Sequence, residues 1–84
     1  MSHADDVREH CARTYIEPAR ARGDRTVAIR SGDVHHALGY SNRFPLVCGA
    51  LGASLFEVQC RLRRLGVEGP VNGANTVFRF ELLP

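Results

Sequence analysis

The last residues of this 84-residue chain constrain its fold more than any other segment. From Thr76 to Leu83 the side chains divide cleanly between two faces, as in a strand with one buried side. Phe78, Phe80 and Leu82 lie on one face, and Val77, Arg79 and Glu81 on the other. The preceding residues 69–75 read GPVNGAN, and glycine and asparagine accept the positive φ values of tight reversals. The chain therefore ends in a hairpin that needs an antiparallel partner strand.

Residues 61–68 are the only segment close enough to supply that partner, although the local pattern also fits a helix. Ser54 and Glu57 have the spacing of a capping box. Helical spacing then continues through Leu55, Val58, Leu62 and Leu65. We expect a helical turn over about 54–59 and a hairpin over about 61–83, bulged at Arg63–Arg64 where the alternation slips. A fourth helix through Val67 is the alternative.

The middle of the chain predicts a short strand followed by two helices. Residues 26–30, TVAIR, have β-branched residues at alternate positions, with Val27 and Ile29 facing the core. A second helix is expected over about 32–38, capped at Ser31 or Gly32–Asp33 and stopped by Gly39 in a left-handed conformation. A third helix is expected over about 42–52, with Asn42 as its cap and Pro45 in its first turn.

The third helix has one apolar stripe, formed by Phe44, Val47, Cys48 and Leu51. Only the tight turn at residues 39–41 separates it from the second helix, so the two are expected to form a helix-turn-helix pair.

The N-terminal part predicts a first helix over about 5–16. Asp5 and Asp6 lie at the positive end of its dipole, and Val7, Cys11 and Tyr15 share one face. Proline removes a backbone donor, so Pro18 should end or kink this helix near Ile16–Glu17. Residues 19–25 then form a polar connector, in which Arg20, Arg22 and Arg25 are expected to be surface charges.

Composition indicates one soluble domain. Chains of this length bury a single core, and 44% hydrophobic residues is too apolar for a disordered segment. The N-terminus has no apolar signal stretch, and no run approaches the ~18 apolar residues of a membrane span. Three cysteines without a Cys-x-x-Cys pair suggest reduced thiols in the cytoplasm.

The chain has eleven arginines and no lysine. Its net charge of +2 is nevertheless too small to identify a nucleic-acid partner.

Two stretches carry a resemblance to a known family: SGDVHHALGYSNRFPLVCGAL over residues 31–51, and EGPVNGANTVF over residues 68–78. Together they resemble small prokaryotic proteins of the winged-helix type, over about residues 26–83. The resemblance implies an α+β fold, the winged helix-turn-helix, with a three-helix core, a strand after the first helix and a C-terminal two-stranded wing. It also implies the usual occupation of that family, binding double-stranded DNA as a transcriptional regulator or a recognition module.

In that family plan the third helix enters the major groove and the wing follows the adjacent phosphates. The plan assigns Ser41, Asn42 and Arg43 to the start of the recognition helix, although the role of helix cap is the favoured explanation of Asn42. On the wing it assigns Arg61, Arg63, Arg64, Asn72, Asn75 and Arg79 to DNA. A shared solvent face for Arg61, Arg63 and Arg79 would make a basic strip; the alternative is local pairing with Glu68 and Glu81.

The presumed recognition helix departs from the family pattern. Leu46, Gly49 and Ala50 are small or apolar where long polar side chains are typical. A helix so poor in donors reads few base edges, which favours modest sequence specificity, shape readout or a protein interface.

Other functions have weaker support in the sequence. Apolar residues such as Tyr15, Ile16, Phe44 and Leu55 could form a homodimer or partner surface without DNA binding, which is the alternative function. His35 and His36 are adjacent, so on a helix they point about 100° apart and cannot chelate one ion together. With no nucleophile elbow, phosphate loop or paired carboxylates in the sequence, we predict neither enzyme activity, nor a metal, nor a cofactor.

Overall fold

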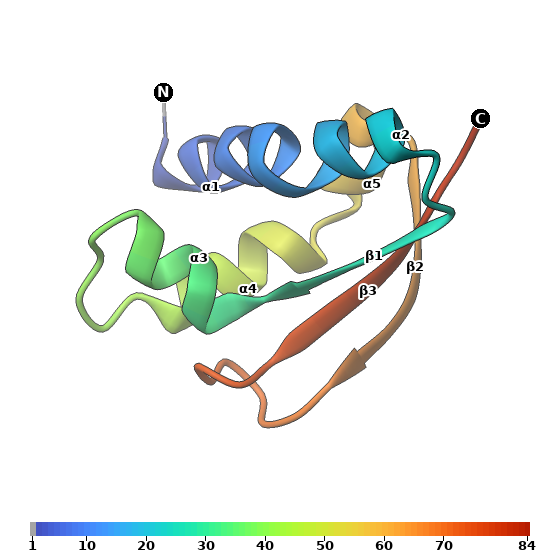
Figure 1. Cartoon of the computed structure of the whole chain (residues 1–84). Coiled ribbons are helices and arrows are strands. Elements are labelled where there is room, and N and C mark those ends of the chain that lie inside the picture. The colour runs from blue at the N-terminus through green and yellow to red at the C-terminus, as the bar shows by residue number, and fades with distance from the viewer. Residues whose placement is uncertain (1) are drawn as a thin grey trace.

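The computed structural model describes residues 2–84 and has an α+β architecture, with helices packed on one face of a three-stranded antiparallel sheet (Figure 1). Along the chain the elements are α1 (His3–Cys11), the π-helical turn η1 (Ala12–Ile16), α2 (Glu17–Arg22), β1 (Thr26–Arg30), α3 (Ser31–Ala37), α4 (Phe44–Gly52), α5 (Ser54–Cys60), β2 (Leu62–Glu68) and β3 (Val77–Leu82). The α+β class predicted from the sequence is confirmed.

The first helix begins with a capping box that the sequence analysis did not identify. The Asp5 backbone N–H donates to Ser2 Oγ at 3.1 Å, and the Ser2 N–H donates to Asp5 Oδ2 at 3.2 Å. The hydrogen bond from the Arg8 guanidinium lowers the pKa of Asp5 most, and the two bonds with Ser2 lower it further. Two donors at the helix start are satisfied in this way.

The first helix was predicted to end or kink near Ile16–Glu17; an element boundary falls there, but helical structure does not end. Helical structure continues without a break through η1 and α2 to Arg22, so α1, η1 and α2 form one rod across the top of the molecule in Figure 1. Pro18 lies in the first turn of α2, directly after the π-helical turn, where a missing backbone donor is tolerated. Gly23, with φ of 78°, ends the rod in the left-handed conformation.

Arg20 is not a surface charge as predicted, because its guanidinium ties this rod to the C-terminal parts of the fold. It donates to the carbonyl oxygens of Leu83 at 2.8 Å and Cys60 at 2.7 Å. These two carbonyls belong to the chain end and to the end of α5, so one side chain joins three segments that are distant in the sequence.

The sheet has the order β1-β3-β2, with both pairs antiparallel. β1 spans the predicted residues 26–30, and β3 keeps the predicted alternation, with Phe78 and Phe80 buried and Arg79 exposed. In β2 the register shifts between Arg64 and Gly66, one residue later than the predicted bulge. The hairpin prediction over residues 61–83 therefore prevails over a fourth helix through Val67, and the helix preceding it stops at Cys60.

Three predicted helix caps are wrong. Asn42 is two residues before the start of α4 and adopts a left-handed conformation with φ of 54°, which asparagine tolerates better than most residues. Ser31 is the first residue of α3 and makes no cap bond. Ser54 likewise lies inside α5, and the side chain of Glu57 accepts the backbone N–H of Arg64 at 3.0 Å instead of closing a capping box.

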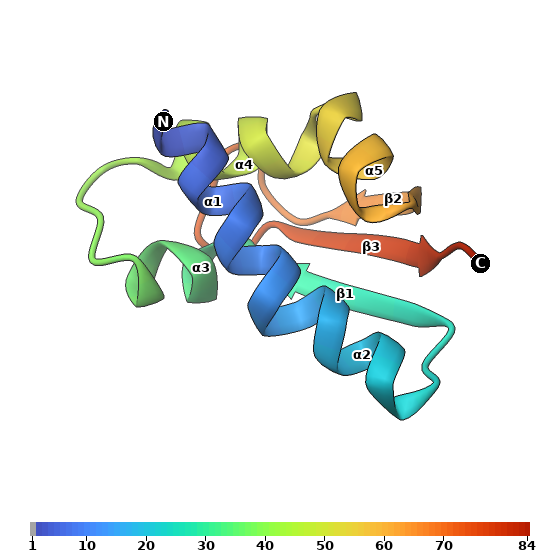
Figure 2. The same cartoon turned by 90° about the horizontal axis from the view of Figure 1, so that it is seen from above.

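The core lies between the rod, α4, α5 and the inner face of the sheet (Figure 2). Its largest fully buried side chains are Phe56 and Phe80, whose ring centroids lie 5.4 Å apart in an edge-to-face arrangement. Ile29 from β1 and Leu51 from α4 belong to the same cluster. The helix pair α3–α4 and the hairpin β2–β3 are thus packed on one common core.

We expect Phe56→Ala to lower the free energy of unfolding by about 3–5 kcal/mol, because it leaves a cavity at the centre of this core. Val58→Ala in the same helix is the control, since Val58 is 74% exposed and its loss should change stability by less than about 0.5 kcal/mol. Urea denaturation followed by circular dichroism measures both. Equal effects of the two substitutions would contradict the assigned core.

Candidate nucleic-acid interface

The predicted residues at the start of the recognition helix form an exposed corner between α3 and α4. Ser41, Asn42 and Arg43 are all exposed. The corner is held from beneath by His35, a buried residue of α3 whose Nε2 accepts the backbone N–H of Arg43 at 3.1 Å. The imidazole also stacks on the ring of Phe44, with centroids 4.0 Å apart and planes at 16°. His35 therefore positions the first residues of α4, whereas its neighbour His36 is exposed.

The outward face of α4 carries no hydrogen-bonding side chain. Pro45 and Gly49 are exposed, and Leu46 and Gly52 are half-buried. The remaining positions after Phe44 are buried in the core. The donor-poor surface predicted for the helix is confirmed at Leu46 and Gly49, whereas Ala50, expected on the same face, is buried in the core.

Arginines stand near both ends of α4. Arg43 directly precedes the helix, and Arg64 from β2 donates from Nη1 to the carbonyl oxygen of Gly52, the last helical residue, at 3.1 Å. Within residues 2–84 neither guanidinium forms an ion pair with a carboxylate, although six other arginines do. Both charges are therefore available to an external anion.

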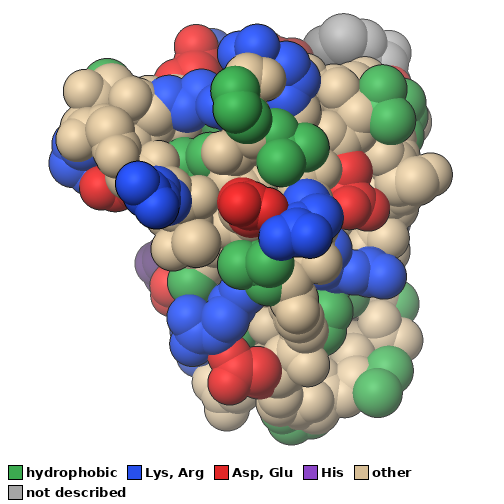
Figure 3. Space-filling model, turned by 90° about the vertical axis from the view of Figure 1, so that its right-hand side faces the viewer, with side chains coloured by type: hydrophobic (Ala, Val, Ile, Leu, Met, Phe, Trp, Pro, Cys, Tyr) green, Lys and Arg blue, Asp and Glu red, His purple; other side chains and the backbone are tan. Residues whose placement is uncertain are grey.

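The predicted basic strip on the hairpin is largely neutralised. Arg63 pairs with Glu81 at 2.7 Å, and Arg79 pairs with Glu68, both across the β2–β3 ladder on its solvent face. Arg61 is not on the strand, because it ends α5 in a left-handed conformation with φ of 53°. In Figure 3 basic and acidic side chains alternate over the side of the molecule that faces the viewer. The local pairing considered in the sequence analysis is thus what the strand register produces.

The hairpin loop, residues 69–76, is fastened to the junction of β1 and α3. The backbone N–H groups of Ser31 and Gly32 donate to the carbonyl oxygens of Thr76 and Ala74, each at 2.9 Å. The Ser31 hydroxyl donates to the carbonyl oxygen of Gly73. Gly32 is required here, since a Cβ on it would lie 2.5 Å from the carbonyl oxygen of Ala74.

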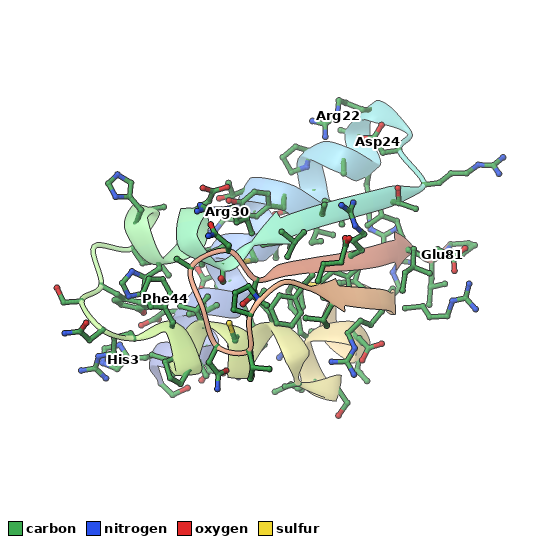
Figure 4. The ribbon with its side chains drawn as sticks, turned by 90° about the horizontal axis from the view of Figure 1, so that it is seen from below. His3, Arg22, Asp24, Arg30, Phe44 and Glu81 are labelled. Atoms are coloured by element: carbon green, nitrogen blue, oxygen red, sulfur yellow. The ribbon has the colours of Figure 1, made fainter. Side chains whose placement is uncertain are left out.

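Arg30 adds a side-chain clamp to the same junction (Figure 4). Its guanidinium donates to Asp33 Oδ1 at 2.8 Å and to Asn75 Oδ1 at 2.6 Å. Asn75, predicted to contact DNA, is therefore occupied by a structural bond, while Asn72 is exposed at the loop tip with φ of 54°. Sequence reasoning missed Arg30, because the contact depends on a partner 45 residues away.

A groove of about 380 Å³ lies between α4 and the hairpin. Its lining is mostly apolar and includes Gly49 and Gly52 from α4, Val67 from β2, and Val71 from the hairpin loop. Arg64 supplies the charged side chain of this lining. The groove thus joins the donor-poor face of α4 to Arg64, one of the two arginines near the ends of this helix.

The thiols of Cys11 and Cys60 have unfavourable settings for nucleophilic chemistry. Burial raises the pKa of Cys11 to about 12, and burial also raises the pKa of Cys60. Cys48 is buried in the core. Among residues 2–84, no three histidine, cysteine, aspartate or glutamate side chains are grouped closely enough to hold a metal ion.

No family model, curated protein or solved structure matches the chain. Over the part of the chain that the structure describes, every helix is too short or too polar to cross a membrane.

Ser31→Ala should lower the free energy of unfolding by about 0.5–1.5 kcal/mol, because it removes the hydrogen bond from the buried Ser31 hydroxyl to the carbonyl oxygen of Gly73 and leaves that oxygen only the longer bond from the Thr76 N–H, at 3.4 Å. Hydrogen exchange at the amides of Ser31 and Gly32 should accelerate as the loop loosens. Ser41→Ala is the matched control, since Ser41 is exposed and its removal should change neither quantity. Unchanged exchange in Ser31→Ala would contradict the role given to this junction.

Proposed function

We propose that this chain is a winged-helix domain that binds double-stranded DNA with modest sequence specificity, as a transcriptional regulator or a recognition module. The order of the elements carries the proposal: a helical rod, a strand, the pair α3–α4, the short helix α5 and a C-terminal hairpin. Apart from α5, which the three-helix plan does not include, this order is the one implied by the resemblance of residues 31–51 and 68–78 to winged-helix proteins. In that plan α4 is the recognition helix and the β2–β3 hairpin is the wing.

Charge near α4 supports contact with phosphates. Arg43 and Arg64 stand near opposite ends of the helix and are free of carboxylate partners within residues 2–84. Arg63 and Arg79, by contrast, are paired with glutamates and contribute less net charge. We therefore assign the main phosphate contacts to Arg43 and Arg64, with Ser41, Asn42 and Asn72 beside them.

Modest specificity follows from the surface of α4. Discrimination among base pairs in the major groove rests mainly on hydrogen bonds to base edges, and the outward residues of α4 have no side-chain donor or acceptor. Most of the affinity should then come from the phosphate backbone, and it should depend strongly on salt.

Fluorescence anisotropy with a labelled random-sequence duplex tests the proposal. Two or three phosphate contacts predict that affinity falls about tenfold to fortyfold between about 50 mM and about 200 mM salt. Arg43→Ala and Arg64→Ala should each weaken binding and reduce the salt dependence by about one contact. Arg22→Ala is the control, because Arg22 is an exposed arginine paired with Asp24 at the far end of the molecule from Phe44 (Figure 4).

An absence of binding at the lower salt concentration would refute DNA binding, since phosphate contacts are strongest there. An equal loss of affinity in Arg22→Ala and Arg43→Ala would indicate a diffuse charge effect and would remove α4 from the interface.

A protein-interaction or dimerisation module is the second candidate, supported by exposed apolar side chains on α5 and the hairpin. Val58 is 74% exposed and Val71 is 89% exposed. The apolar surface differs from the predicted one, because Ile16 is buried and Tyr15 and Phe44 are half-buried. Light scattering separates the candidates: a stable oligomer that never binds DNA supports this one, and a DNA-binding monomer excludes dimerisation.

A further inference from the structure

The surface of α4 limits what this helix can recognise in DNA. Its outward residues are Pro45, Leu46, Gly49 and Gly52, and none can donate or accept a side-chain hydrogen bond. Base edges in the major groove present donors, acceptors and one apolar feature, the C5-methyl group of a pyrimidine. Of these, only the methyl group is complementary to an apolar helix face.

Gly49 leaves open space at the middle of that face. A Cβ built on this residue would meet nothing within 4 Å, and its φ is not positive, so neither packing nor backbone conformation requires glycine. Glycine is also a poor helix former, which makes its presence in a nine-residue helix costly. The space above Gly49 opens into the groove between α4 and the hairpin, so a partner atom can approach the helix backbone closely.

The charges near this face suit a nucleic acid. An α-helix with its side chains is about 10–12 Å in diameter, which fits the roughly 12 Å width of the major groove. Arg43 precedes the helix and Arg64 reaches its last residue. Cations near both ends of the helix, with an apolar surface between them, match phosphates on either side of an apolar feature in the groove.

Resting on the proposed function, we propose that α4 reads the C5-methyl groups of pyrimidines, in thymine or 5-methylcytosine, by apolar contact in the major groove. Gly49 provides the close approach, Pro45 and Leu46 provide the apolar surface beside it, and Arg43 and Arg64 hold the phosphates.

The test compares two duplexes of one A·T-rich sequence, one containing thymine and the other containing uracil in its place. Uracil removes the methyl group and leaves base pairing intact. We expect the uracil duplex to bind about fourfold more weakly for each contacted methyl group, the equivalent of about 0.8 kcal/mol. A second pair of duplexes carries cytosine or 5-methylcytosine and distinguishes the two sources of the methyl group.

A preference in either pair supports the inference, and the pair that shows it identifies the base. Equal binding to both members of both pairs overturns the inference and leaves DNA binding intact. Failure to bind any duplex at low salt overturns the proposed function itself, so the two failures are distinguishable.

Gly49→Gln adds a long polar side chain to the α4 face without a clash. It should bring the ratio of methylated to unmethylated affinity to about one while leaving the salt dependence in place. Gly66→Gln is the matched control, because a Cβ at Gly66 in β2 also meets nothing within 4 Å and lies outside α4. Circular dichroism verifies that both variants fold. An unchanged ratio in Gly49→Gln, or an equal loss in Gly66→Gln, would overturn the assignment to α4.

Discussion

The junction between β1 and α3 is the constraint on which the candidate interface depends. Two backbone hydrogen bonds from Ser31 and Gly32 and the hydroxyl bond of Ser31 attach the hairpin loop to the start of α3. The loop would otherwise be free at the end of a two-stranded ribbon, as loop tips generally are. Because the same short helix α3 also holds Arg43 through His35, the hairpin and the start of α4 are positioned by one element. The width of the groove between them is therefore set by local contacts and not by a flexible loop.

Much of the fold could be predicted from periodicity, and the errors concern helix ends. The alternation of Phe78 and Phe80 identified β3, and the need for an antiparallel partner outweighed the helical spacing through Leu65. Proline usually ends a helix, but the π-helical turn η1 precedes Pro18, which therefore lies in the first turn of α2. No local sequence pattern indicates this π-helical turn. Asn42 was predicted to be a cap, but asparagine also tolerates the left-handed conformation that it adopts here, and no local pattern distinguishes the two.

The candidate site was less predictable than the fold, since charge pairing depends on strand register. Arg63 faces Glu81 because Leu62 pairs with Leu82, a relation fixed only once the two strands are aligned. The hydrogen bonds of the Arg30 and Arg64 side chains could likewise not be predicted, because their partners, the Asn75 amide and the Gly52 carbonyl, are distant in the sequence. The donor-poor face of α4, in contrast, could be read directly, since it depends only on which residues a regular helix turns outward.

In the proposed interface, affinity and selectivity come from different contacts. Arginine–phosphate contacts supply most of the affinity, and apolar contact with α4 supplies the selectivity. Guanidinium contacts with phosphate weaken as salt rises, because bound counterions are released on binding. Burial of a methyl group against Leu46 and Gly49 involves no charge, and exclusion of water drives it with little dependence on ionic strength. Salt should therefore reduce binding to all duplexes by the same factor and leave the preference for methylated pyrimidines unchanged. A helix that used arginine or asparagine for base readout would lack this separation, since its specific contacts would themselves carry charge or hydrogen bonds.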